Sequence, residues 1–265
     1  MSGRSFEQSL PTLIGRANEF ADRGLALIGG LRAEQMTGVT LPDTTVWKLH
    51  LVATINYRAG LVCLRQAETS LGAFTLLRGL LEAWAHLAFI QDNAAGGDAR
   101  CRALRFERGV SREWANDVRV APPGFDQAAW QAWHAAYDRE LDDLWRQLGC
   151  RGQNRTQSQA ATTLAGLSSQ PAMEWVDGVW RSTSAATHMY GVEFALADRG
   201  DGTTELVWAL PAHRASWLMW LAASYSYLTT TAATILRPGA PEIADFHNST
   251  GAFLNDPDLR AAVSS

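Results

Sequence analysis

The stretch LLRGLLEAWAHLAFI, from Leu76 to Ile90, decides the fold class. If this stretch forms a helix, apolar side chains point in nearly every direction around its axis, so most of that helix must be buried. Arg78, Glu82 and His86 interrupt the apolar surface at steps of four residues, and each step turns about 40° around the helix axis. The three polar side chains therefore form one slanting stripe. The sequence predicts a core helix of a helical bundle that carries a polar stripe.

Helical patterns extend along most of the chain, so the predicted fold class is all-α. Amphipathic spacing, capping residues and Gly or Pro breaks predict helices over 5–34, 43–68, 73–92, 98–118, 126–148, 171–190 and 211–237, with a short helix at 160–167. A small hairpin or loop insertion is expected near 192–209, where the pattern alternates weakly around a Gly/Asp centre. We expect a single-domain bundle of about six or seven helices over 1–237, followed by a loose C-terminal tail over 238–265.

The composition indicates a globular protein. Of the 265 residues, 47% are hydrophobic and 19% are charged, and the net charge of −4 creates no overall basic field for nucleic acid. The three cysteines, Cys63, Cys101 and Cys150, are odd in number and widely spaced, so we expect reduced thiols in a cytoplasmic protein. Residues 215–236 contain no charge, but their Ser, Thr and Tyr residues favour a buried bundle helix over a membrane span. No membrane association is expected.

A second stretch, WRSTSAATH, carries the candidate chemistry. Its Arg181 and His188 are seven residues apart, so they share a helix face about 10 Å apart along the axis, with Ser184 between them. Arginine presents a fork suited to phosphate oxygens, and histidine exchanges a proton near neutral pH. Such a pair suits metal-independent RNA cleavage, in which the ribose 2′-hydroxyl attacks the adjacent phosphate. The alternative is a surface ion pair between Arg181 and Asp177, one helical turn away.

The two stretches resemble a group of bacterial helical proteins that share an Arg-x-x-x-Glu helix and a later aromatic-Arg-x-x-Ser-x-x-x-His helix. The second motif is similar to the Arg-x(4–6)-His signature of the HEPN superfamily, whose members are helical bundles. Many are metal-independent endoribonucleases of toxin or antiviral defence systems, and they are often dimeric. The resemblance implies that Arg181 binds phosphate and His188 transfers a proton, while Arg78 and Glu82 complete the catalytic site. The side chains expected to contact substrate are Ser184, His86 and Trp180.

The same resemblance implies RNA or a nucleotide as the ligand, a homodimer, and no cofactor or metal. Two other functions stay open. One is an enzyme that acts on a small molecule between the helices, with a metal version that would use Glu82, His86, His188 and Glu193 as ligands. The other is a non-catalytic regulatory or partner-binding bundle.

The fourth predicted helix offers a separate basic face. Its arginines recur at helical spacing and could follow a phosphate backbone. Acidic residues lie close to them in the sequence, so a mixed, solvated face is the alternative. The arginines are Arg105, Arg108, Arg112 and Arg119.

Overall fold

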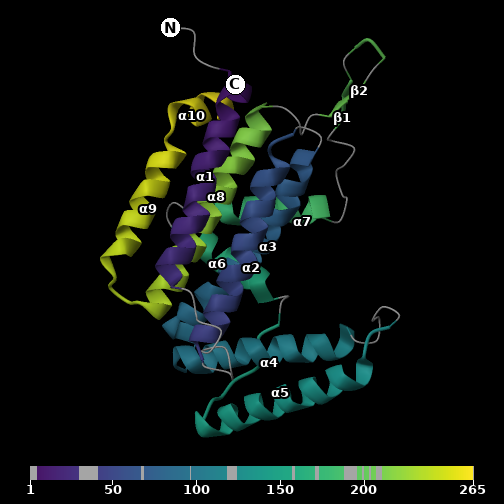
Figure 1. The fold of residues 1–265 in the computed structure, drawn as a ribbon, viewed down its shortest axis with the longest axis vertical. Helices are drawn as coiled ribbons and strands as arrows, with labels where there is room; N and C mark the ends of the chain where they lie inside the picture. Colours follow the sequence, from purple (N-terminus) through teal and green to yellow (C-terminus); the bar gives the residue numbers. More distant parts are fainter. Residues whose placement is uncertain are drawn as a thin grey trace.

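The chain forms a bundle of long helices from which an arm of two helices projects at one end (Figure 1). The computed structural model describes residues 5–29, 41–66, 69–95, 97–117, 124–156, 159–170, 173–187, 196–198, 200–202, 204–206 and 211–264. Within these ranges there are ten α-helices, one 3-10 turn and one two-stranded hairpin. The helical bundle is confirmed, but it has more helices than the six or seven predicted.

The helices are α1 Phe6–Ile28, α2 Asp43–Cys63, α3 Ser70–Gln91, α4 Ala99–Asp117, α5 Gln127–Gln147, α6 Ala160–Ser168, α7 Trp175–Thr187, α8 Pro211–Leu236, α9 Pro241–Leu254 and α10 Pro257–Val263, with the 3-10 turn at Asn93–Ala95. Strands β1 Leu196–Asp198 and β2 Thr204–Leu206 pair antiparallel, with Leu196 opposite Leu206. A hairpin was predicted in this region. α1 ends at Ile28, earlier than predicted, because Gly29 adopts φ 73° and ψ 126°, a non-helical conformation that glycine accepts readily.

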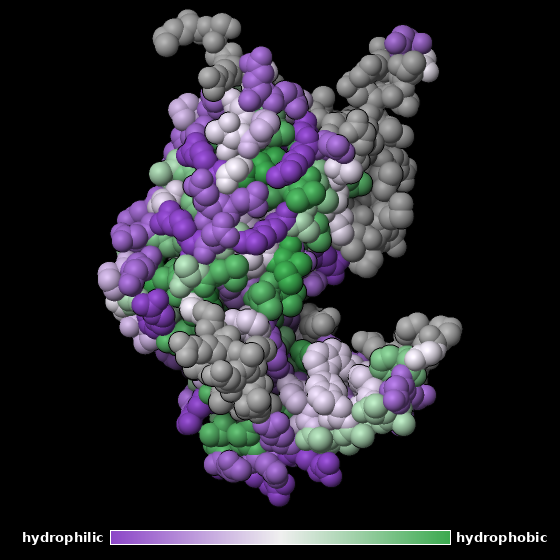
Figure 2. All heavy atoms as spheres, in the orientation of Figure 1, coloured by the Kyte–Doolittle hydropathy of each residue, from purple (hydrophilic) through white to green (hydrophobic). Residues whose placement is uncertain are grey.

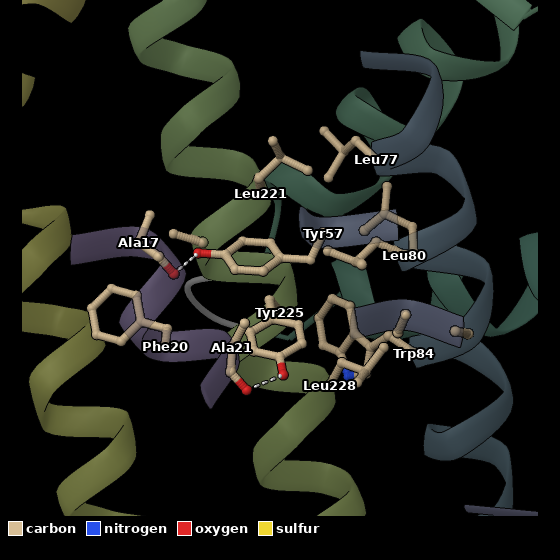
Figure 3. Close-up of a cluster of buried hydrophobic side chains, with 14 of the residues drawn as sticks. Ala17, Phe20, Ala21, Tyr57, Leu77, Leu80, Trp84, Leu221, Tyr225 and Leu228 are labelled. Atoms are coloured by element: carbon tan, nitrogen blue, oxygen red, sulfur yellow. Dashed lines mark hydrogen bonds between the residues drawn. The ribbon is translucent and has the colours of Figure 1, made fainter. Parts of the chain in front are cut away.

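The centre of the bundle is α8, which contacts α1, α2, α3, α9 and α10. Tyr225 of α8 stacks on Tyr57 of α2 with 4.4 Å between ring centroids. Figure 3 shows how both rings reach α1: Tyr57 Oη donates to the Ala17 carbonyl at 2.9 Å, and Tyr225 Oη donates to the Ala21 carbonyl at 3.4 Å. Buried tyrosines need such acceptors, so this pair fixes three helices relative to one another.

The uncharged segment 215–236 belongs to α8, and many of its side chains are buried inside the bundle. One helix of the described residues, α3, is long and apolar enough to cross a membrane by length and composition. In the structure, 67% of its most apolar window is buried among the other helices.

The C-terminal segment forms helices in the part that the structure describes, so the expectation of a loose tail is wrong there. Phe246 and Phe253 of α9 pack edge-to-face on Phe20 of α1, with ring centroids 6.4 Å and 5.2 Å away. Pro241 and Pro257 begin α9 and α10, because proline is well accommodated in a first helical turn.

The arm consists of the antiparallel helices α4 and α5. At its root, the buried Arg102 donates through Nε to the Ile90 carbonyl at 2.7 Å, which fixes the turn from α3 into α4. Glu107 of α4 accepts from Thr45 of α2 at 2.8 Å and from Tyr137 of α5 at 2.6 Å. One buried carboxylate thus ties the arm to the bundle.

A disulfide between Cys101 and Cys150 joins the start of α4 to the segment after α5. The expectation of reduced thiols is therefore wrong for these two residues, because the α4–α5 hairpin brings together cysteines that are 49 positions apart; Cys63 is free. From the disulfide, residues 150–156 run back along α4. They can lie close because Gly109 has no side chain, and a Cβ there would overlap the carbonyl oxygen of Arg155.

Candidate functional site

The polar stripe of α3 meets α7 through Arg78. Its Nε donates to Glu82 Oε1 at 3.1 Å, and its guanidinium carbon lies 5.0 Å from the centre of the Trp180 ring. Arg78, Glu82 and Trp180 are all half-buried, and Ser184, one turn beyond Trp180, is half-buried as well. The structure therefore brings together three of the residues singled out in the sequence, with Ser184 on the next turn of α7.

Arg181 turns away from this cluster. Its side chain is 77% exposed, and its Nε donates to Asp177 Oδ2 at 2.7 Å. The local ion pair that the sequence offered as an alternative is thus present. His188 lies outside the described residues, so the predicted distance between Arg181 and His188 stays a prediction.

His86, the third member of the stripe, lies inside the protein and has different partners. Its ring is 4% exposed and packs against Phe106 with 4.6 Å between ring centroids. Its Nδ1 accepts a hydrogen bond from Arg155 Nε at 3.2 Å. Burial, and then the charge of Arg155, lower the pKa of His86 to about 3, so the ring is neutral at physiological pH. The stripe is therefore divided between two separate sites.

Arg155 is the functional candidate that the sequence analysis missed. It is 6% exposed, and its Nη2 donates to the Gln159 carbonyl at 3.1 Å and to Thr163 Oγ1 at 2.6 Å. Its guanidinium carbon lies 4.3 Å from the centre of the Phe89 ring. Burial, and then the charge of Arg105, lower the pKa of Arg155 to about 10. No local pattern marks this arginine, because its contacts with His86 and Phe89 of α3 join positions far apart in the sequence.

A cavity of about 910 Å³ opens beside Arg155. The end of α3, α4 and α6 line it, and most of the polar lining residues carry amide or hydroxyl groups. Arg105 also lines the cavity, with its guanidinium carbon 5.0 Å from the centre of the Phe89 ring on which Arg155 packs. Two arginines therefore share one aromatic ring at the wall of a ligand-sized space.

The basic face expected on α4 is mixed. Arg108 pairs with Asp142 at 2.6 Å and packs over Trp145, with 4.7 Å from the guanidinium carbon to the ring centroid. Arg108 and Arg112 line a second cavity, of about 600 Å³, together with the acidic Glu113. Arg119 lies outside the described residues.

Ser111, His134 and Asp138 lie as close together as a hydrolytic triad. His134 Nε2 is 2.9 Å from Ser111 Oγ, and His134 Nδ1 is 3.5 Å from Asp138 Oδ2. However, His134 Nε2 also lies 2.8 Å from the Ser111 carbonyl, which can only accept, so this nitrogen carries the proton and cannot act as a base. Ser111 is 1% exposed and its hydroxyl donates to Asp138 Oδ1 at 2.5 Å. The cluster cross-links α4 and α5.

Among the described residues, no three His, Cys, Asp or Glu side chains are grouped to hold a metal ion. Of the four ligands considered from the sequence, Glu82 pairs with Arg78 and His86 accepts from Arg155. The other two, His188 and Glu193, lie outside the described residues.

No protein-family model, no curated protein and no solved structure matches the chain.

Proposed function

We propose that this chain is a HEPN-like protein that acts on RNA at the face shared by α3 and α7. The observation that supports the proposal is the packing of Arg78 on Trp180, because it joins the two motifs on which the resemblance rests. Arg181 follows Trp180 in the chain and extends into solvent, where a strand of RNA can reach it.

In the proposed reaction, the 2′-oxygen of a ribose attacks the adjacent phosphorus and the bond to the 5′-oxygen breaks. His188 accepts the proton of the attacking hydroxyl, and the leaving oxygen takes up a proton from water. Arg181 neutralises charge on the phosphate oxygens, after release from Asp177. The products are a 2′,3′-cyclic phosphate and a 5′-hydroxyl end.

Cleavage of a labelled single-stranded RNA tests this proposal. We expect His188→Ala to reduce the rate at least about 100-fold, the usual contribution of a general acid or base. His213→Ala is the matched control, because His213 is exposed near the start of α8, outside the proposed site. Equal rates for wild-type protein and His188→Ala would remove His188 from catalysis. In cells, a toxin or defence role predicts growth arrest on overexpression that the same substitution relieves.

We also propose a second copy of the chain as partner. The most exposed large apolar side chains of the described residues lie on α2, on the arm or just before α5: Val52, Ile55, Val62, Trp114, Phe125 and Trp133. Lys48 connects α2 to the arm, since its Nζ lies 5.6 Å from the centre of the Tyr137 ring of α5. Figure 2 shows the molecule hollowed where the arm leaves the bundle, with hydrophobic atoms exposed on the bundle side.

The geometry of α2 favours a two-fold pair. In an antiparallel pair of α2 helices centred on Ile55, Val62 of each copy reaches the corner formed by Lys48 and Tyr137 of the other. Charge supports this arrangement, because α2 carries two basic and one acidic side chain, whereas α5 carries four acidic and two basic ones. A heterologous partner is the competing outcome.

A further inference from the structure

Arg155 is a buried cation, and its hydrogen-bond partners in the described part of the chain are all neutral. Nε donates to His86 Nδ1, and Nη2 donates to a carbonyl and a hydroxyl. Nη1 has no hydrogen-bond partner among the residues that the structure describes. A charge removed from water is costly unless an opposite charge or a full set of hydrogen bonds compensates it. Among the described side chains, no carboxylate is bonded to this positive charge at the cavity wall.

A second cation lies next to it. Arg105 donates through Nε to the Gln153 carbonyl at 2.7 Å, and its backbone carbonyl accepts from the Arg155 amide at 2.9 Å. Both guanidinium groups pack on Phe89. The charge of Arg105 acts unfavourably on Arg155, and an anion bound near both groups would offset that repulsion.

The cavity suits an anionic ligand with a polar body. Gln91, Asn93, Thr162 and Gln170 supply amide and hydroxyl groups around the two arginines. Asp92 is the acidic residue of the lining, and its Oδ1 accepts from the Ala94 amide at 2.8 Å in the turn after α3. The volume of about 910 Å³ lies within the usual range for small-molecule sites.

We propose that this cavity binds the phosphate group of a small phosphorylated molecule of nucleotide size, held by Arg155 and Arg105. A planar guanidinium matches two phosphate oxygens, and two guanidinium groups match a dianion. Neutral His86 is a positioning residue, since its Nδ1 holds Nε of Arg155 and sets the direction of the guanidinium. The site is separate from the proposed RNA-cleaving face, and neither proposal depends on the other.

Thermal unfolding and calorimetry with defined probes test the proposal. Inorganic phosphate and adenosine 5′-monophosphate should raise the melting temperature, whereas adenosine and sodium chloride at equal ionic strength should not. Stronger binding of the monophosphate than of inorganic phosphate would identify a nucleotide-like ligand, and equal binding would identify the phosphate group alone. Equal effects of phosphate and chloride on the wild-type protein would overturn the proposal.

Variants locate the binding. Arg155→Gln should weaken phosphate binding at least about tenfold, because a charge-assisted hydrogen bond is lost. Since Arg155 also packs inside the protein, Arg105→Gln at a half-buried position provides a second variant with the same expected direction. Arg108→Gln is the matched control on α4, where the arginine pairs with Asp142 and lines the other cavity. Wild-type affinity in both Arg155→Gln and Arg105→Gln would contradict the site, while His188→Ala should bind phosphate normally.

Discussion

Arg155 Nε donates to His86 Nδ1 across 3.2 Å, although 69 residues separate them in the sequence. The acceptor must be an unprotonated ring nitrogen, so this hydrogen bond requires neutral His86. A second histidine, His50, is also neutral in the folded protein. It is buried 3.1 Å from Thr229 Oγ1, and burial lowers its pKa to about 4.

These two histidines make stability depend on pH. In the unfolded chain they take up protons below about pH 6.5, while the folded protein excludes those protons until about pH 4 for His50 and pH 3 for His86. We expect the free energy of unfolding to be level above pH 7. It should fall by about 1 kcal/mol per histidine between pH 6.5 and 5.5. Urea denaturation at several pH values measures this slope.

His86→Gln isolates one of the two contributions. Glutamine keeps an acceptor for Arg155 but does not titrate, so the slope of stability against pH should become shallower. His213→Gln, at an exposed position, should keep the wild-type slope. Identical slopes for His86→Gln and wild type would show that His86 does not cause the pH dependence.

Two glycines of α1 should respond oppositely to the same substitution. A Cβ at Gly24 would lie 2.5 Å from Tyr225 Oη, so Gly24→Ala must displace the buried ring and should cost about 1–3 kcal/mol. Gly15 has no neighbouring atom within 4 Å of the Cβ position, and Gly15→Ala should stabilise by about 0.5–1 kcal/mol. Chemical denaturation of both variants measures the difference. A neutral Gly24→Ala would show that the Tyr225 ring can move without loss.

The disulfide should contribute to the stability of the arm. It closes a segment of 49 residues, and Cys101→Ser should lower the free energy of unfolding by about 2–4 kcal/mol under oxidising conditions. Cys63→Ser provides the control, since Cys63 is free and half-buried. Adding a reductant should bring the wild type to the level of Cys101→Ser. Mass spectrometry that finds free thiols at both Cys101 and Cys150 in the oxidised protein would contradict the bond.

The proposed dimer predicts a specific response at Ile55, whose side chain is 58% exposed. Ile55→Glu would place two carboxylates face to face at the two-fold axis, so light scattering should report a monomer where the wild type is a dimer. Ile55→Cys should form a symmetric cross-link under mild oxidation. Thr12, exposed on α1, is the control position for both substitutions. A monomeric wild type over a wide concentration range would rule the dimer out.

The sequence predicted well those elements whose burial follows from the spacing of residues close together in the chain. α3 is an example: its apolar residues point in nearly all directions around the helix axis, which requires a position in the core, and the helix is found there. The pairing of Arg181 with Asp177 was also visible as a spacing of four residues. Local geometry is enough for both statements.

Contacts between distant segments could not be predicted in this way. Arg155 lies in a polar stretch without periodicity, and its contacts with His86 and Phe89 come from α3, far away in the sequence. The disulfide depends on the hairpin of α4 and α5. The C-terminal helices were not predicted, although Pro241 and Pro257 lie at helix starts, where proline is favoured.

The proposed phosphate cavity depends on the uncharged Gly109, because only a residue without a side chain leaves room for the segment that carries Arg155. A methyl group at 109 would push residues 150–156 outward, and the guanidinium of Arg155 would withdraw from Phe89 and His86. The contact of residues 150–156 with α4 and the affinity for the ligand would then be lost together, although no charged group of the protein had been removed.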